Sequence, residues 1–174
     1  MSKAAELANL IGNINAGGGG VNRNLIINGA MKICQRHASN SVQLSATEQY
    51  LTDRFFNDTG SSFDMKADAV QSTDAPSGFS NSLKLSCDGV SSLSSSSNGG
   101  ITQHIEGFNC QPTAFGTSDA KPLTLSFYAK SSSANNGHIY GVMLGAFLNG
   151  TRNIQTRGFT VTSSWQRFSM TFQP

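Results

Sequence analysis

The fold class is decided by one stretch of sequence, Leu123-Thr124-Leu125-Ser126-Phe127-Tyr128-Ala129-Lys130, in which apolar and polar side chains alternate. Successive side chains of an extended chain point to opposite faces of a sheet, so the odd-numbered positions share one face and the even-numbered positions share the other. The stretch therefore predicts a β-strand with one buried face and one exposed face.

Tight turns follow this strand. The dipeptides Asn136-Gly137 and Asn149-Gly150 flank the apolar stretch His138–Leu148. Asn-Gly readily adopts the positive φ angles of a type I′ turn, which joins neighbouring antiparallel strands. The second half of the chain is therefore predicted to be a β-meander.

The same pattern of apolar segments, separated by clusters of Gly, Asn, Ser and Asp, extends along the rest of the chain. Further strands are predicted at Leu25–Ile33, Leu51–Asn57, Ser82–Cys87, Ile101–Glu106, Arg157–Thr162 and around Phe168, Met170 and Phe172. About eight short strands, with no helical pattern after the N-terminus, predict an all-β fold. We expect an antiparallel β-sandwich of jelly-roll type over residues 23–174, with the Ser-rich tract at 90–100 as an exposed loop.

The first 22 residues are predicted to form a separate element. Apolar side chains recur at helical spacing over Met1–Ile11. A helix this short is not stable alone in water, so its face bearing Leu7, Leu10 and Ile11 is predicted to dock on a partner. The four consecutive glycines that follow have the composition of a flexible linker. A phosphate-binding loop is disfavoured because no strand precedes the glycines and no Gly-Lys-Ser follows them.

Composition indicates an ordered protein without a strong electrostatic partner. Only 13% of the residues are charged, yet the chain has 11 Phe, which disfavours disorder. The formal net charge of +2 and the dispersed basic residues disfavour nucleic acid and membranes as partners. No stretch approaches the ~20 apolar residues of a membrane span and no signal peptide is recognisable, so we expect a protein made and kept in a cytoplasm.

No pattern of chemically active residues stands out. The chain has 10 acids, so a carboxylate pair for glycoside cleavage is arithmetically available, but no spacing selects one and solvated loop acids are favoured. The histidines, His37, His104 and His138, lack metal-ligand spacing. The stretch from Asp58 to Asp74 is rich enough in Asp for a structural calcium ion, although it contains no twelve-residue calcium loop. We expect no enzyme, no cofactor and no other metal site.

The cysteines and the pair Asp53-Arg54 are both interpreted as structural. The cysteines, Cys34, Cys87 and Cys110, are odd in number and widely spaced, which predicts reduced, buried thiols; Cys87 also continues the alternation of Leu83 and Leu85. Asp53-Arg54 precedes the apolar pair Phe55-Phe56. There a charged side chain is expected to fix the preceding loop by hydrogen bonds, which is favoured over ligand contact.

Several blocks, in order, resemble one family. They are Asn24–Met31 with Gln35-Arg36, Tyr50–Phe55, Ser82–Cys87, Gln103–Gly107, Leu123–Lys130 and Ser164–Phe172. Together they resemble the N-terminal region of tail fibres and related virion appendages of marine phages, of the cyanophage and pelagiphage kind. The start, Met1–Ala8, is similar to the start of such fibres. The resemblance implies a jelly roll like those of galactose-binding and carbohydrate-binding modules.

The resemblance also implies a role. It implies a structural, non-enzymatic homotrimer in the virion tail, assembled in the host cytoplasm and docked on tail or adaptor proteins. Domains of this family normally close with a further strand after the Trp-containing one, whereas this chain stops at Pro174. A longer fibre is the preferred explanation, and a strand supplied by another chain is the alternative.

Sugar binding is the main rival function. Carbohydrate-binding sandwiches stack exposed aromatic rings on sugars, and Tyr128, Tyr140 and Trp165 are the candidates for contact with a host surface glycan. Packing of these rings at a sheet edge or a subunit interface is favoured. A capsid-mounted decoration fibre and, more remotely, a glycan hydrolase also stay open.

Overall fold

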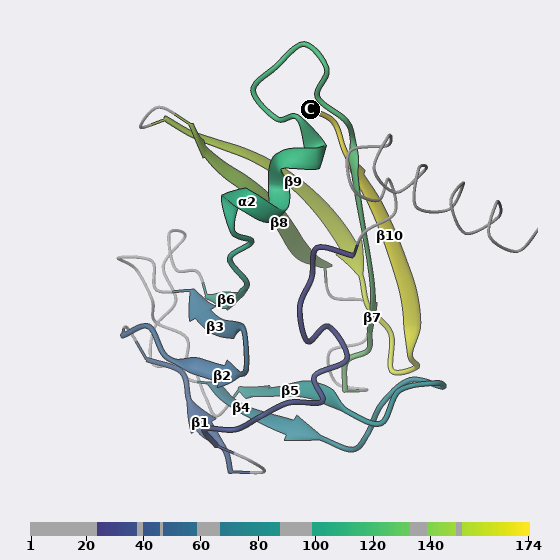
Figure 1. Cartoon of the computed structure of the whole chain (residues 1–174). Coiled ribbons are helices and arrows are strands. Elements are labelled where there is room, and N and C mark those ends of the chain that lie inside the picture. The colour runs from purple at the N-terminus through teal and green to yellow at the C-terminus, as the bar shows by residue number, and fades with distance from the viewer. Residues whose placement is uncertain are drawn as a thin grey trace, which may run out of the picture. The chain divides into compact units, whose positions relative to one another are not determined.

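The computed structural model describes residues 24–37, 40–45, 47–58, 67–87, 99–132, 139–148 and 151–174. The described residues are mostly β-strands in antiparallel sheets, which confirms the all-β prediction (Figure 1). They gather into two compact units, one within 26–105 and the other formed by 24–25 and the described residues of 106–174. The predicted N-terminal helix and glycine linker lie outside the described residues, and the predicted limits at 1–22 and 23–174 stay a prediction.

The 26–105 unit contains two three-stranded antiparallel sheets. In one sheet β4 (Ala67–Ser72) lies between β1 (Val42–Gln43) and β5 (Ser82–Cys87). In the other, β3 (Phe55–Asp58) lies between β2 (Tyr50–Thr52) and β6 (Gly100–Thr102). The predicted strand at Ser82–Cys87 is confirmed at both ends.

Aliphatic side chains from both sheets form one buried cluster in this unit, and Phe55 and Phe56 of β3 are also buried. The buried cluster, with Leu83 packed against it, consists of Val42, Leu44, Leu51, Ala67 and Ala69. The alternation of β4 places Ala67 and Ala69 inward, each 1% exposed. The alternation of β5 does not bury its whole face, because Leu85 is 41% exposed. A core of this kind is small, so other interactions must hold the long connections.

Three predicted strands of this unit differ in the structure. The segment predicted as a strand at Leu25–Ile33 is a turn at 27–30, with positive φ at Asn28 (57°) and Met31 (52°). The predicted strand Leu51–Asn57 is a hairpin, because the chain reverses at 53–54, where Arg54 has φ 76°. The predicted strand Ile101–Glu106 pairs only as far as Thr102. In the first two cases a turn interrupts an apolar run that alternation alone predicts to be extended.

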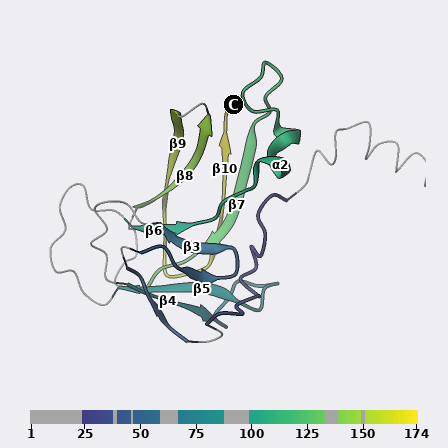
Figure 2. The same cartoon turned by 60° about the vertical axis from the view of Figure 1, so that its left-hand side comes forward.

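The 106–174 unit begins with two short helical turns, α2 (Gly107–Cys110) and the 3-10 helix η1 (Gln111–Thr113). Its strands form two antiparallel pairs. One pair is β7 (Leu123–Ala129) with β10 (Gln166–Phe172), and the other is β8 (Ile139–Leu148) with β9 (Thr151–Thr160), seen side by side in Figure 2. The strand predicted at 157–162 is the end of β9.

The predicted β-meander is wrong, because β7 pairs with β10 instead of with β8, the next strand along the chain. Two other sequence signals of this unit agree with the structure. The odd-numbered residues of β7 are half-buried and the even-numbered ones are exposed, as the alternation predicts. The register of β8 and β9 pairs Leu148 with Thr151, as a connection through Asn149-Gly150 requires. The other Asn-Gly dipeptide, at 136–137, lies outside the described residues.

An aromatic cluster joins the two strand pairs of this unit. The ring centroid of Phe159, from β9, lies 5.0 Å from that of Phe127 and 4.9 Å from that of Phe168. Phe127 and Phe168 are stacked at 5.6 Å, as expected for cross-strand partners. Phe172, farther along β10, is 1% exposed. Aromatic burial therefore supplies the core here.

Candidate functional site

The block Asn24–Met31 folds around the side chain of Asn28. The Asn28 Oδ1 accepts a hydrogen bond from the Ile33 N–H (3.0 Å), and its Nδ2 donates to the carbonyls of Ile33 (2.9 Å) and Asp53 (2.9 Å). These three hydrogen bonds use both the oxygen and the nitrogen of the Asn28 side-chain amide. Because the side chain supplies partners that a sheet ladder would supply, the segment forms a turn instead of the predicted strand.

Side chains from distant segments hold the same block. Gln103 binds the backbone of Ile27 twice: its Oε1 accepts from the Ile27 N–H and its Nε2 donates to the Ile27 carbonyl, both at 2.8 Å. Gln71 Nε2 donates to the carbonyls of Met31 (2.6 Å) and Lys32 (3.1 Å). At both places a side-chain amide binds backbone groups that a neighbouring strand would otherwise bind.

Asp53 fixes the loop before its strand, as the sequence predicts. The Asp53 Oδ2 accepts a hydrogen bond from the Gln35 N–H (2.7 Å), and the Asp53 N–H donates to the Ile33 carbonyl (3.2 Å). A bond to an ionised carboxylate is about twice as strong as a neutral one. The blocks at 24–36 and 50–55 are therefore tied together by Asp53 and Asn28.

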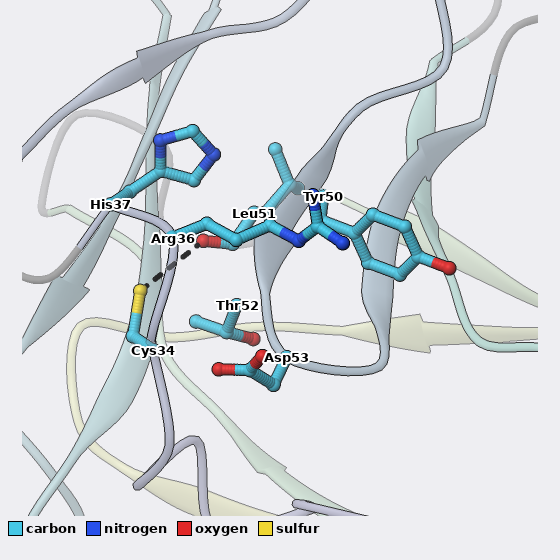
Figure 3. Close-up of a pocket in the computed structure, with 7 residues that line it drawn as sticks. All are labelled: Cys34, Arg36, His37, Tyr50, Leu51, Thr52 and Asp53. Atoms are coloured by element: carbon cyan, nitrogen blue, oxygen red, sulfur yellow. Dashed lines mark hydrogen bonds between the residues drawn. The ribbon is translucent and has the colours of Figure 1, made fainter.

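A shallow hollow of about 120 Å³ lies beside this junction, lined by Cys34, Arg36, His37, Tyr50, Leu51, Thr52 and Asp53. Figure 3 shows Arg36 extending across it to Tyr50, with the guanidinium carbon 4.9 Å from the ring centroid. Cys34 Sγ contacts the Leu51 carbonyl oxygen at 3.6 Å. The 120 Å³ includes open solvent and the enclosed space is close to zero, whereas pockets for small ligands are roughly 300 Å³ or larger. The hollow therefore suits local packing better than ligand capture.

Sequence reasoning missed Asn57, the most buried polar residue of this unit at 0% exposed. Its Oδ1 accepts from the Gln49 N–H (2.7 Å), while its Nδ2 donates to the carbonyls of Ser45 (2.7 Å) and Thr47 (3.2 Å). Asn57 thereby satisfies the backbone of the loop before β2. The signal available in the sequence was an Asn directly after Phe55-Phe56, at the end of a buried run.

The outward face of β7 and β10 brings together two of the three predicted aromatic residues. We call it the Tyr128–Trp165 face and define it by Ser126, Tyr128, Lys130, Trp165, Arg167 and Ser169. Tyr128 is 40% exposed and pairs across the strands with Arg167. Lys130 Nζ lies 5.2 Å from the ring centroid of Trp165, one step beyond the last pair of the ladder.

Polar contacts order this face. Arg167 Nη2 donates to Ser126 Oγ (3.1 Å), so the guanidinium leans along the neighbouring strand. The hydroxyls of Thr124 and Thr171 form a cross-strand hydrogen bond of 3.1 Å farther along the same face. The contact of Lys130 with Trp165 is a cation–π interaction. The two cations are thus held beside the two aromatic rings.

Tyr140 lies apart from this face. Its ring centroid is 5.8 Å from that of Phe159, which contacts Phe127 on the opposite face of β7 from Tyr128. Tyr140 is nevertheless 43% exposed. The structure therefore places Tyr128 and Trp165 together and Tyr140 at the rim of the aromatic cluster.

The free thiols Cys34 and Cys110 are both half-buried, and the side chain of Cys87 lies outside the described part. Burial, and secondarily the carboxylate of Glu106, raises the pKa of the Cys110 thiol. The Glu106 Oε2 also accepts from Asn109 Nδ2 (3.2 Å). A raised pKa keeps the thiol protonated, which is the opposite of what a nucleophilic cysteine needs.

Other sequence predictions fall partly outside the described residues. Leu7, Leu10 and Ile11, the predicted docking residues, all lie there. Within the described ranges, no three His, Cys, Asp or Glu side chains gather as a metal site would require. Asp64 and the side chain of Asp58 lie outside them, so the calcium ion stays a prediction. No described helix is long and apolar enough to cross a membrane.

Comparison with known proteins identifies no relative: no family model, no curated protein and no solved structure matches this chain. Its own side chains therefore carry the functional argument. They form two contrasting sites, a network of backbone-bound amides in the 26–105 unit and an ordered aromatic and cationic face in the 106–174 unit.

Proposed function

We propose that this chain is a structural, non-enzymatic component of a phage virion, the N-terminal region of a tail fibre. It anchors the fibre to tail or adaptor proteins as a homotrimer and spaces the distal receptor-binding part. In this proposal residues 1–22 form the docking helix and linker, and residues 23–174 form a β-sandwich of jelly-roll type. The antiparallel strands of the structure support the second part.

The observation that carries the proposal is how the family-like blocks use their polar side chains. Asn28, Asp53 and Gln103 come from three of those blocks, and all three bind backbone groups of the 24–36 segment. Residues placed for chemistry keep their polar atoms directed at a substrate. Residues that bind backbone stiffen the scaffold, which a spacer requires.

The test is deletion of residues 2–20 in the phage. We expect particles that lack the appendage, because the docking element is removed while the described strands remain. A finer variant replaces Leu7, Leu10 and Ile11 with Ser, and its matched control is the double change Lys3→Gln and Glu6→Gln. Circular dichroism of each purified protein establishes that the β-structure is intact.

The proposal predicts loss of appendages for the deletion and the apolar variant alone. Electron micrographs that show appendages at normal occupancy in the deletion would overturn anchoring. Appendages attached to the head rather than the tail would make the chain a capsid-mounted decoration fibre, which has the same chemistry at another address.

A carbohydrate-binding adhesin is the second candidate function, and the Tyr128–Trp165 face favours it. Two aromatic residues lie diagonally across the two strands on an outward sheet face, with Tyr128 partly exposed. Such a platform can stack on the apolar side of sugar rings. Binding of host surface glycans by the isolated full chain, abolished by Tyr128→Ala, would support the adhesin.

A further inference from the structure

We infer that the Tyr128–Trp165 face binds an anionic glycan, a polysaccharide whose sugar rings carry carboxylate or sulfate groups. This inference rests on the second candidate function and deepens it by naming the ligand class. Neither the anchoring role nor the aromatic platform alone requires a charged ligand. The requirement comes from the cations that the fold places among the rings.

The four central side chains form a two-by-two pattern. Tyr128 lies opposite Arg167 across the strands, and Lys130 lies over Trp165 one step farther along. Each aromatic ring therefore has a cation both across from it and beside it on its own strand. Neighbouring strands are about 4.8 Å apart, and same-face positions along a strand are about 6.7 Å apart. A sugar ring stacked on the exposed ring of Tyr128 would therefore present its substituents to a cation.

The charge of this region is complementary to an anion. Neither β7 nor β10 contains an acidic residue. Residues 106–174 include five Lys and Arg against two Asp and Glu, a formal net charge of +3 in a chain whose total is +2. The remaining residues, 1–105, are thus slightly acidic. Positive charge is concentrated in the unit that carries the face.

The face is ordered before any ligand arrives. Arg167 is held by its bond to Ser126, and Lys130 is held over Trp165. A guanidinium has five donors, and the bond to Ser126 uses one, so a ligand carboxylate can be bound by the others. Preorganised side chains lose less conformational entropy on binding. The seven paired positions of the β7–β10 ladder supply a rigid support.

Charge density separates a glycan from nucleic acid. Proteins whose binding to duplex DNA is strongly electrostatic make about 6–10 phosphate contacts, whereas this face offers two cations. A uronic acid polymer carries about one charge per sugar, which matches two cations beside an exposed aromatic ring. An anionic polysaccharide is therefore the better fit, and an oligonucleotide serves as the competing outcome.

The experiment uses the full chain and two pairs of polymers, each with a charged member and a neutral member on the same sugar backbone. Affinity gel electrophoresis is run with polygalacturonate and with its fully methyl-esterified form, and with dextran sulfate and dextran. Oligothymidylate and polyglutamate are tested as other polyanions. The variants are Tyr128→Ala and Arg167→Gln, with Arg167→Lys as the milder change. Lys121→Gln repeats the charge loss away from the face, and Tyr140→Ala removes the aromatic ring that lies elsewhere.

We expect retardation by polygalacturonate or dextran sulfate and at least tenfold weaker binding to the neutral partner. Tyr128→Ala and Arg167→Gln should each weaken binding about tenfold, as loss of a central aromatic or Arg contact does. Lys121→Gln and Tyr140→Ala should leave it unchanged. Equal binding to neutral and charged forms, lost in Tyr128→Ala, would keep the adhesin and overturn the anionic ligand.

The other outcomes are also decisive. No binding to any of the polysaccharides overturns the adhesin and the anionic ligand together, while the anchoring role is judged separately by the deletion of residues 2–20. Equal retention by oligothymidylate or polyglutamate would show attraction to any polyanion and overturn a glycan site. Unchanged affinity in both Tyr128→Ala and Arg167→Gln would place the ligand elsewhere on the chain.

Discussion

The 26–105 unit and the 106–174 unit provide hydrogen-bond partners for their backbone groups in different ways. The first has strands of two to six residues and relies on the side chains of Asn28, Asn57 and Gln103 to bind its long connections. The second has strands of seven and ten residues whose ladders pair the backbone directly. Polar side chains are consumed by structure where ladders are short. Where ladders are long, polar side chains bond to one another on the sheet surface.

The strongest way to break this contrast is Asn57→Ala. The change removes three side-chain bonds and leaves buried backbone groups of the 45–49 loop without partners, so the free energy of unfolding should fall by about 2–4 kcal/mol. Urea unfolding followed by circular dichroism measures it. Asn40→Ala, at an exposed position, is the matched control and should change stability by less than about 0.5 kcal/mol. Equal effects from both variants would contradict a structural role for the buried amide.

A smaller effect is expected from Gln103→Ala, which removes both bonds to Ile27. The free energy of unfolding should fall by about 1–2 kcal/mol, and hydrogen exchange at the Ile27 amide should become faster. Thr124→Val removes an exposed side-chain bond of the other unit and should cost less than about 0.5 kcal/mol. A larger loss for Thr124→Val than for Gln103→Ala would reverse the contrast between the units.

The smallest effect concerns the pKa of Cys110, which burial and Glu106 raise. Glu106→Gln removes the negative charge that helps to raise this pKa, so the thiol should ionise more readily and react faster with iodoacetamide at mildly alkaline pH. Mass spectrometry of the labelled peptide distinguishes Cys110 from the other thiols. Asp119→Asn removes a charge from another turn and should leave the rate unchanged. A slower reaction in Glu106→Gln would contradict the electrostatic cause.

The same shift has a consequence for stability. Because folding raises the pKa of Cys110, the native state holds this proton more tightly than the unfolded chain does. The contribution to stability is complete below the unfolded pKa of the thiol and is lost as the pH rises through its folded pKa. Glu106→Gln should reduce this alkaline loss.

The sequence predicts the features that depend on neighbouring residues. Alternation located β7, and the apolar and polar pattern at 82–87 located β5 with its correct limits. It failed at Leu25–Ile33, because the partner that holds Ile27 is Gln103, 76 residues away. A side chain that binds the backbone in place of a neighbouring strand leaves no periodic pattern in the sequence, because its position depends on the tertiary fold.

The residues at and near the Tyr128–Trp165 face also divide into those that the sequence predicts and those that it does not. Parity alone predicted the exposure of Tyr128, which depends only on its place in β7. The importance of Arg167 and Lys130 was not foreseen, because their nearness to the rings depends on the register between β7 and β10. Tyr140 and Tyr128 are both tyrosines in predicted strands, so the sequence does not distinguish them. The structure does, because the ring of Tyr140 packs against that of Phe159.

The ammonium group over Trp165 gives the protein a built-in optical probe. Trp165 is the only tryptophan in the chain, and the positive charge of Lys130 lies 5.2 Å from its ring centroid. The excited state of an indole is sensitive to a charge at that distance, so any ligand that draws Lys130 away should change both the wavelength and the intensity of emission. Fluorescence of the unlabelled protein would therefore report what touches this sheet surface, without a chromophore being introduced.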